Sequence, residues 1–403
     1  MKKIALILPE AGPIPAVKGG AIEELVTILV EQNEIEQKVE FLVFCAENEE
    51  AMELAEKYRH SRIIYIKKTS LPDRIINRLI RYSNKIFTNK NFIDIAYYRR
   101  VFRYLKEDRP DAIVAEGGLY HEFRRFSQEF GKQKIYLHIH HQLLCEPYID
   151  HIYGSVIGIS QFATREWLRT TQDKSVKAYT VYNCVNEDKF KTKITNEERE
   201  QIREKFGFKK DDTVVLYCGR ITEVKGTREL VQAVLNTGRT DIKLLVIGSA
   251  GFGGDTITPY VHEVQQLVKQ SEGRIQFTGY IENKELYRYY QAADLQVIPS
   301  LWEEAAGLIA IEGMLSGLPL IVTRSGGLIE YAPENVAVQV DRKDIVQNLV
   351  KAIEELADDK QKRKRMQTLS IERAQAFPKK KFYNDFIEVF ENEGTGKREG
   401  THY

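Results

Sequence analysis

The sequence predicts an α/β protein built from two doubly wound domains that face each other across a cleft. Short apolar segments alternate with longer segments of helical periodicity almost from end to end. The apolar segments are continuous, which is typical of parallel strands buried on both faces. This alternation is interrupted by a polar, helix-forming stretch, residues 191–210, and then starts again. The restart indicates a second sheet.

In the first domain, helical periodicity separates most of the apolar segments, for example over residues 21–30 and 75–87. Gly19-Gly20 lies between the first strand and the first helix. Backbone without side chains at such a turn allows a ligand to approach closely, although ordinary loops use the same pair. The expected strands are residues 4–8, 39–44, 63–66, 112–115, 135–139 and 156–159.

The second domain follows the same pattern, and its expected strands are residues 214–219, 243–247, 274–277, 295–298, 318–322 and 336–340. We expect the domains to be residues 1–185 and 186–378. A last periodic segment, residues 379–393, is expected to pack back on the first domain as a helix. Residues 394–403 are expected to be a disordered tail.

Composition excludes several classes of function. The 403 residues are enough for two or three domains, and the net charge of +1 argues against a general nucleic-acid binder. The four cysteines form no C-x-x-C pair, which argues against a zinc site or a disulfide framework and suits the cytosol. No apolar run reaches the roughly 18 residues of a membrane-spanning helix. We therefore expect a cytoplasmic enzyme.

Two cations follow the first strand of the second domain. Arg220 comes directly after Gly219 at the strand end, and Lys225 precedes Gly226 at the start of a helix. Because ligands of open parallel sheets bind at the carboxyl ends of the strands, this pair is a candidate clamp for a diphosphate. The alternative is that both are solvated loop cations.

Two acids follow the strand at residues 295–298. If Glu304 lies in a loop and Glu312 in the helix after it, both can line one elongated ligand and accept hydrogen bonds from hydroxyl groups. The helix N-terminus near Ala305–Leu308 offers N–H groups to a phosphate. The alternative is a surface helix with solvated glutamates, but the neighbouring residues are mostly apolar.

Three histidines close the strand at residues 135–139. Period-two alternation puts His138 and His140 on one face, with His141 next in the chain. No Asp, Glu or Cys nearby in the sequence has ligand spacing, so we predict no metal. Two interpretations remain: a polar histidine that faces the cleft, or a structural histidine held by hydrogen bonds.

Residues 74–87 predict a basic amphipathic helix. Arg74, Arg78, Arg81 and Lys85 form one stripe, and an apolar stripe lies beside it. Such a helix can lie on an anionic membrane surface. The alternative is an ordinary helix whose apolar side faces the core.

Together these features resemble the retaining glycosyltransferases of family 4, which have two Rossmann-like domains in the GT-B fold. The resemblance is strongest over residues 214–330, and the N-terminal segment is similar to a bacterial subgroup that includes spore-coat-associated and surface-polysaccharide transferases. The matching positions are Gly19-Gly20, His140, Ser160, Asn183–Asn186, Gly219-Arg220, Lys225-Gly226, Gly279-Tyr280, Glu304, Glu312 and Gly326-Gly327. The chain departs from the family pattern at Cys184, at Asn186 and at Ala305-Ala306.

The resemblance implies roles for the catalytic positions. Arg220 and Lys225 would hold the diphosphate of a nucleotide sugar, Glu304 the donor sugar and Glu312 the ribose hydroxyls. His140 would line the sugar pocket.

The resemblance also implies binding positions. Tyr280 and Ile281 would contact the nucleobase. Backbone N–H groups of Ala306, Gly307 and Leu308, and of Gly19 and Gly20, would approach sugar or phosphate. UDP is the expected donor nucleotide, with no metal or other cofactor. The acceptor would be a glycan, a lipid-linked molecule or a protein, and the helix at residues 74–87 would allow contact with the inner face of the cell membrane.

Three alternative functions remain open on the sequence. A sugar-nucleotide epimerase or hydrolase would use the same donor site without the acceptor. A coat-associated structural protein would keep the fold without turnover, although such a protein has no use for buried charge. A dinucleotide-dependent oxidoreductase is disfavoured because no G-x-G-x-x-G follows the first strand.

Overall fold

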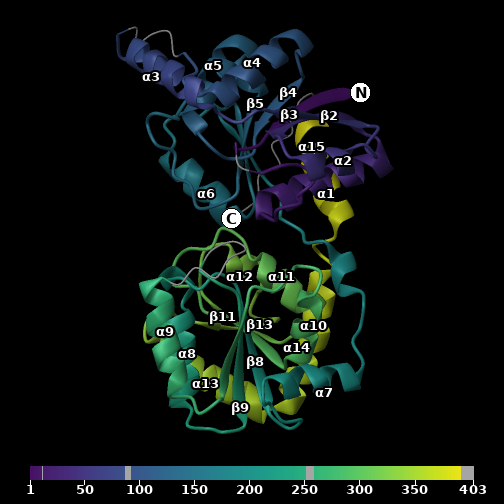
Figure 1. Ribbon diagram of the computed structural model, residues 1–403, viewed down its shortest axis with the longest axis vertical. Helices are drawn as coiled ribbons and strands as arrows, with labels where there is room; N and C mark the ends of the chain where they lie inside the picture. The colour runs from purple at the N-terminus through teal and green to yellow at the C-terminus, as the bar shows by residue number, and fades with distance from the viewer. Residues whose placement is uncertain (11, 87–91, 251–257, 392–403) are drawn as a thin grey trace. The chain divides into compact units, whose positions relative to one another are not determined.

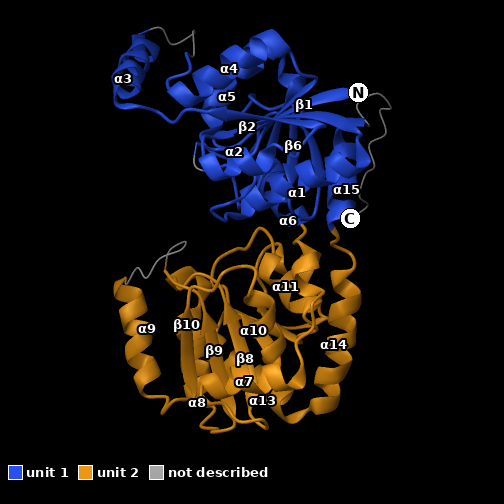
Figure 2. Ribbon diagram, turned by 45° about the vertical axis from the view of Figure 1, so that its right-hand side comes forward, with its two compact units in different colours: residues 1–183, 379–403 blue, residues 184–378 orange. Residues whose placement is uncertain are grey.

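The computed structural model describes residues 1–10, 12–86, 92–250 and 258–391. The chain divides into two compact units, each with its own sheet (Figures 1 and 2). The first unit contains residues 1–183 and the chain from Lys379 onward, and the second contains residues 184–378. The expected tail at residues 394–403 lies outside the described residues.

The sheet of the first unit has seven parallel strands in the order β3-β2-β1-β4-β5-β6-β7. At its centre, Leu6 pairs with Val43 on one side and with Val114 on the other. The strands are β1 Lys2–Ile7, β2 Val39–Ala46, β3 Ser61–Ile66, β4 Ala112–Ala115, β5 Ile135–Ile139, β6 Ser155–Gly158 and β7 Lys177–Thr180. Only β7 was not expected, because this edge strand is not a continuous apolar run and its residues are exposed or half-buried.

Helices cover both faces of this sheet. The last of them, α15, returns from the far end of the sequence and packs beside α1, where the Tyr383 hydroxyl donates to Asn33 Oδ1 at 2.7 Å. The described part of this segment, residues 379–391, thus belongs to the first unit. The helices of the unit are α1 Ala21–Glu36, α2 Glu49–Ala55, α3 Leu71–Ile86, α4 Ala96–Asp108, α5 Phe123–Phe130, α6 Gln161–Thr170 and α15 Lys379–Glu391, with short 3₁₀ turns at Tyr120–Glu122 and Lys132–Lys134.

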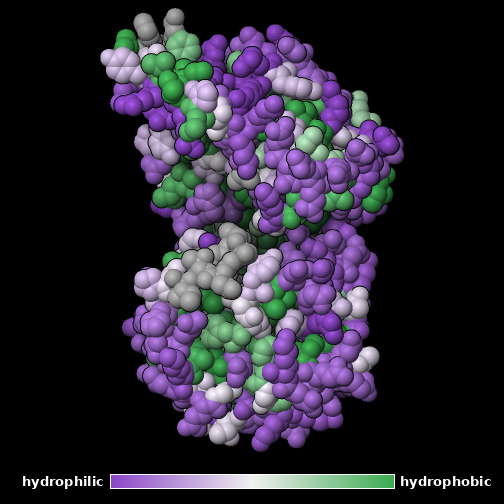
Figure 3. All heavy atoms as spheres, in the orientation of Figure 1, coloured by the Kyte–Doolittle hydropathy of each residue, from purple (hydrophilic) through white to green (hydrophobic). Residues whose placement is uncertain are grey.

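Helix α3 is a long helix that buries very little of its surface. Asn77 is its only buried residue. Members of the apolar stripe face outward: Leu79 is 63% exposed and Ile76 47%. The alternative, that the apolar side faces the core, therefore does not hold for Ile76 and Leu79. Figure 3 shows apolar and charged side chains next to each other on this helix, at the upper left.

The sheet of the second unit has six parallel strands in the order β10-β9-β8-β11-β12-β13. The strands are β8 Thr213–Cys218, β9 Ile242–Ile247, β10 Ile275–Gly279, β11 Leu295–Ile298, β12 Leu320–Thr323 and β13 Ala337–Val340. All six were expected, within a few residues. Their apolar side chains form one core with the inner faces of α8, α9 and α13.

The helices of the second unit have local signals of their own. Thr195 and Glu198 form a reciprocal capping box at the start of α7, and Thr258 caps α9. The helices of this unit are α7 Asn196–Lys205, α8 Thr227–Asn236, α9 Pro259–Lys269, α10 Leu286–Ala292, α11 Leu308–Leu315, α12 Leu328–Tyr331, α13 Ile345–Asp358 and α14 Lys360–Ala374, with 3₁₀ turns η3 Glu187–Phe190 and η4 Glu223–Lys225.

Strand order identifies where each sheet binds ligands. The order reverses between β1 and β4 in the first unit and between β8 and β11 in the second. Crevices form beyond the carboxyl ends of the strands at such reversals. The segments after these four strands contain most of the residues that the sequence singled out.

Candidate active site

The β8–α8 connection is held tightly against the segment after β11. Gly226 has φ of +69°, and a Cβ built on it would lie 2.0 Å from the carbonyl oxygen of Pro299. Only glycine allows this approach without a shift of the backbone. The contact brings Lys225, at the end of η4, next to the loop that precedes α11.

Lys225 and Glu304 meet in this arrangement. Lys225 Nζ lies 2.6 Å from Glu304 Oε1, and the side chains are 18% and 13% exposed. The ammonium group also lies 4.9 Å from the centre of the Trp302 ring. The hydroxyl of Ser300, itself buried, donates to the same Glu304 oxygen. The structure therefore joins one of the two predicted cations to one of the two predicted acids.

The Glu304 backbone is fixed as firmly as its side chain. Its N–H donates to Ser325 Oγ at 3.0 Å, and its carbonyl accepts from the N–H of Gly327 at 2.6 Å. Beside it, the Glu303 carboxylate accepts from the N–H of Gly326 and pairs with Arg342. The Gly326-Gly327 turn thus braces the loop that carries the candidate acid.

Arg220 belongs to the same β8–α8 connection as Lys225 but is exposed. Its backbone is anchored, because its carbonyl accepts the Tyr217 hydroxyl at 2.7 Å. Glu304 lies in the loop before α11, whereas Glu312 lies within that helix, as the sequence analysis considered.

Glu312 is held by a residue that the sequence analysis did not identify. The hydroxyl of Tyr290 on α10 donates to Glu312 Oε2 at 2.7 Å. Burial raises the pKa of Tyr290 well above its usual value, so the phenol stays protonated and remains a donor. Tyr290 is remote from the motif in sequence, and only the packing of α10 against α11 brings it there.

The remaining predicted positions of the second unit lie near the start of α11 and after β10. Gly307 precedes α11, and its carbonyl accepts the N–H groups of Ala310 and Ile311 at 2.9 and 3.1 Å. Ala306 and Leu308, on either side of it, are half-buried. Tyr280 and Ile281 follow β10, where Tyr280 is 54% exposed.

In the first unit, Gly19 and Gly20 form the turn before α1 with φ of +72° and +112°. A Cβ on Gly19 would meet nothing within 4 Å, whereas a Cβ on Gly20 would lie 2.2 Å from Glu23 Oε2. Ser160, another matching position, caps α6 by accepting the N–H of Ala163 at 3.1 Å. That contact explains Ser160 by structure alone.

Two of the three histidines form hydrogen bonds to the same carboxylate oxygen. His138 Nδ1 and His140 Nε2 lie 2.8 and 2.9 Å from Glu116 Oε2. The side chains of His138, His140 and Glu116 are 1%, 6% and 0% exposed. His141 is exposed, with Nε2 3.5 Å from the Tyr120 hydroxyl. Glu116 directly follows β4, and His138 and His140 lie at the end of β5 and just after it. Neighbouring strands thus bring together residues that have no common motif.

Protonation in this cluster follows from burial and from the pairing. Burial, the largest influence, would raise the pKa of Glu116, but the charge of His138 and the hydrogen bonds from both histidines outweigh it and lower the pKa to about 2. Burial lowers the pKa of His140 to about 4, helped by the charge of His138. Near neutral pH, Glu116 is therefore ionised and His140 neutral. A carboxylate only accepts, so His140 Nε2 carries the hydrogen and Nδ1 is an acceptor.

These three side chains are also close enough to hold a metal ion. Histidines that bind metals keep the second ring nitrogen in a hydrogen bond. Within the described residues, His138 Nε2 and His140 Nδ1 are buried and have no partner. The geometry fits a hydrogen-bonded cluster better than a metal site.

Residues 198–373, which lie within the second unit, match the family model of glycosyl transferases group 1. Spore coat protein SA of Bacillus subtilis is 26% identical over 339 residues, which are 82% of this chain and 83% of the relative. The lipopolysaccharide 1,2-N-acetylglucosaminetransferase of Salmonella typhimurium is 25% identical over 264 residues, 64% of this chain and 61% of the relative.

Solved structures share the fold over both units. A glycosyltransferase from Rickettsia africae superposes with a TM-score of 0.75 at 17% identity and covers 98% of this chain and 100% of its own. Anabaena HepE in complex with UDP and glucose gives a TM-score of 0.72 at 18% identity over 96% of this chain and 99% of its own. The two predicted parallel-sheet, Rossmann-like domains are thus confirmed.

Proposed function

From the premise that this chain is a glycosyltransferase, which the family model and the relatives indicate, we propose that it is a retaining enzyme of family 4. It moves a sugar from a nucleotide diphosphate sugar to a glycan or lipid-linked acceptor in the synthesis of bacterial surface polysaccharide or another glycoconjugate. The observation that carries the proposal is the contact between Lys225 and Glu304 beyond the ends of β8 and β11.

The donor diphosphate binds between Arg220 and Lys225. Lys225 is paired with Glu304, so binding of the diphosphate replaces one anionic partner of the ammonium group by another. Glu304 is then available to accept hydroxyl hydrogens of the sugar. Arginine and lysine together with backbone N–H groups near the start of α11 suit a diphosphate.

The rest of the donor extends from this point. Glu312, fixed by Tyr290, accepts the ribose hydroxyls, and Tyr280 and Ile281 contact the base. His140 is proposed to contact a sugar hydroxyl. Its Nδ1 is a buried acceptor without a partner in the described structure, which a sugar hydroxyl would satisfy. UDP is the favoured nucleotide, supported by the Anabaena protein with UDP and glucose.

Catalysis follows from the charge that develops when the bond between the anomeric carbon and phosphate oxygen breaks. The sugar becomes positive and the leaving diphosphate negative, and Arg220 and Lys225 stabilise the leaving group without a metal ion. The acceptor hydroxyl attacks the same face. Its proton passes to an oxygen of the departing diphosphate, and the products are the glycoside and the nucleoside diphosphate.

Product analysis tests this function. The full chain is incubated with UDP-, GDP-, ADP- and TDP-sugars, with and without acceptors, and the anomeric configuration of the product is read by proton NMR. We expect release of nucleoside diphosphate that depends on the acceptor, and an unchanged anomeric configuration. Inversion of the anomeric configuration would contradict the retaining mechanism. Release of an epimerised or hydrolysed sugar whether or not an acceptor is present would favour a sugar-nucleotide epimerase or hydrolase instead.

We further propose that the enzyme works on the cytoplasmic face of the membrane, with α3 in contact with anionic lipid. Within the described chain, none of the helices is both long and apolar enough to cross a bilayer. The exposed apolar stripe of α3 lies beside four cations, which suits an interfacial helix. In co-sedimentation, phosphatidylglycerol vesicles should bind the chain and phosphatidylcholine vesicles should not. Ile75→Glu with Leu79→Glu should abolish binding, whereas equal binding to both vesicles excludes the proposal.

A further inference from the structure

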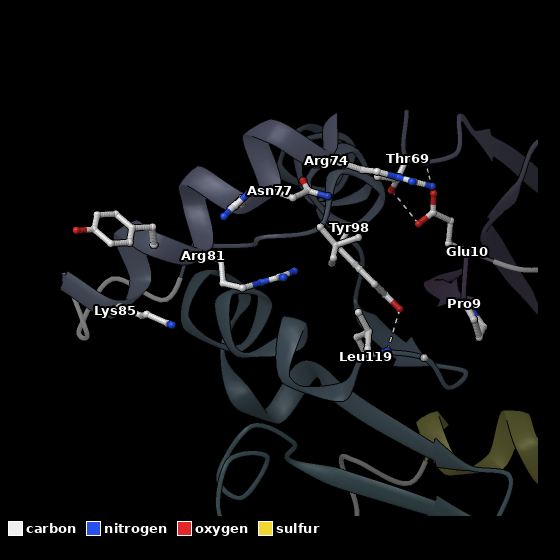
Figure 4. Close-up of a pocket in the computed structure, with 13 residues that line it drawn as sticks. Pro9, Glu10, Thr69, Arg74, Asn77, Arg81, Lys85, Tyr98 and Leu119 are labelled. Carbon is white, nitrogen blue, oxygen red and sulfur yellow. Dashed lines mark hydrogen bonds between the residues drawn. The ribbon is translucent and has the colours of Figure 1, made fainter. Parts of the chain in front are cut away.

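A cavity of about 970 Å³ lies under α3, beyond the carboxyl ends of β1 and β4 (Figure 4). Its walls are one face of α3, the start of α4 and the segments that follow the two strands. This is the strand-order reversal of the first unit, where ligands of such sheets bind. Its volume is at the upper end of the range for small-molecule sites.

Positive charge dominates the lining. Arg74, Arg78, Arg81 and Lys85 face the cavity, and Glu10 is the one acid among the described residues that line it. Glu10 is already bound, because its Oε2 accepts the Thr69 hydroxyl at 2.9 Å.

Most of this charge has no carboxylate partner among the described residues. Arg81 pairs with Asp94 at 3.1 Å, which holds the second half of α3 in place. In the described parts of the chain, no carboxylate pairs with Arg74, Arg78 or Lys85. The spacing of these residues puts them on one side of the helix. Such a group of cations is a site for an anion with several oxygens.

A buried polar group also points to a ligand. Asn77 lines the cavity, is 5% exposed, and its Oδ1 has no hydrogen-bond partner in the described structure. An orphaned acceptor of this kind requires a donor such as a hydroxyl group.

The floor of the cavity depends on a glycine. Gly118 has φ of +89°, and a Cβ on it would lie 2.3 Å from the Tyr98 hydroxyl oxygen. That oxygen accepts the N–H of Leu119 at 3.2 Å. A side chain at this position would displace Tyr98, so glycine keeps the cavity in its present shape.

We propose that this cavity binds the acceptor through a phosphate ester, with the cations on the phosphate oxygens and Asn77 on a hydroxyl of the attached sugar. The inference rests on the proposed function and adds the class of acceptor. Arginine favours phosphate because the guanidinium group forms paired hydrogen bonds to its oxygens. The shared chemistry is the phosphate, whether it belongs to a free sugar phosphate or to a lipid-linked one.

The test maps binding by hydrogen exchange on the full chain. The probes are glucose 1-phosphate in solution and, separately, farnesyl diphosphate in phosphatidylcholine vesicles. We expect protection of residues 71–86 and 117–119 by at least one probe. Protection by both indicates recognition of the phosphate itself, and protection by farnesyl diphosphate alone identifies a lipid-linked acceptor.

Variants connect the protection to the cations. Arg74→Gln with Arg78→Gln should raise the Kd of the probe about tenfold or more. Arg103→Gln with Arg165→Gln removes two exposed arginines outside the cavity and should leave the Kd unchanged. Protection confined to residues 219–226, or an equal Kd in both double variants, would overturn the proposal.

Donor binding is the separate measurement. A thermal shift with UDP should be the same in the Arg74/Arg78 variant and in the wild type. If neither probe protects residues 71–86 and 117–119 from hydrogen exchange but UDP still shifts the melting temperature, only the acceptor inference is refuted. Absence of every nucleotide and nucleotide-sugar effect refutes the proposed function.

Discussion

At the scale of single residues, the two units hold their acids in different ways. Glu304 keeps a cation beside it at moderate exposure, whereas Glu116 is completely buried between two histidines. The first arrangement can exchange its partner for a ligand. The second fixes the orientation of His140 and leaves one ring nitrogen available.

The cations of the second unit should affect turnover more than stability. Arg220→Ala and Lys225→Ala should each lower kcat on the order of 10²- to 10³-fold, because each removes charge that stabilises the leaving diphosphate. Lys269→Ala, an exposed cation of α9, is the control. Steady-state kinetics with the donor found by the product assay measures the effect. Unchanged kcat in both site variants would contradict the assignment.

The Glu116 cluster should make stability depend on pH. The folded-state pKa of His140, about 4, lies below its unfolded value of 6.5, so the native state binds fewer protons. The free energy of unfolding therefore falls as the pH drops through this window, by about 2 kcal/mol between about pH 6.5 and pH 5. His140→Asn keeps an N–H donor for Glu116 but does not titrate, so it should lose this part of the slope.

Urea denaturation at several pH values measures that slope. The matched control is His262→Asn, which replaces an exposed histidine of α9 and should leave the slope as in the wild type. A slope that is the same in His140→Asn and in the wild type would show that His140 is not held neutral in the folded protein.

At the scale of elements, continuous apolar runs were enough to predict most strands, because burial on both faces leaves such runs in the sequence. The strand β7 has no such run and depends on its pairing with β6. For α3, the sequence shows a basic stripe and an apolar stripe, but it does not show whether other elements pack against the apolar one. Glu116 was missed because its partners come from a neighbouring strand, and Tyr290 because its partner comes from another helix.

The β8–α8 turn supports a prediction at this scale. Gly226→Ala should destabilise the second unit by more than about 2 kcal/mol and lower donor affinity. The new Cβ would clash with the Pro299 carbonyl oxygen, and alanine is also strained at the positive φ of this position. Gly238→Ala has a similar φ of +64° with nothing within 4 Å, and should cost only about 1 kcal/mol. Chemical denaturation compares the two. Equal losses would mean that the Pro299 contact has no structural importance.

At the scale of the whole molecule, the first unit is formed from two separate stretches of the chain. Its closing helix α15 buries an aromatic and aliphatic face, with Phe390 4.9 Å from the Tyr136 ring centre to centre. The helical periodicity after Pro378 predicts that this helix returns to the first domain. The particular contact with Asn33 could not be predicted, because it joins positions 350 residues apart.

Removal of α15 should therefore affect the units unequally. A chain ending at Pro378 loses several buried side chains, each worth about 1.5–3 kcal/mol, which together are comparable with the total stability of a domain. Calorimetry should show loss of the transition of the first unit and retention of that of the second. A chain ending at Glu391 is the control and should keep both. Parallel loss of both transitions in the shorter chain would show that the units do not unfold separately.

This split arrangement also sets an order for biosynthesis. Translation proceeds from the N-terminus, so the ribosome completes every strand of the second unit before it makes the helix that covers α1. The nascent first unit must wait with part of its apolar surface uncovered while the later unit is already complete. A pause or premature stop near the end of the message would leave this earlier half exposed to chaperones and proteases.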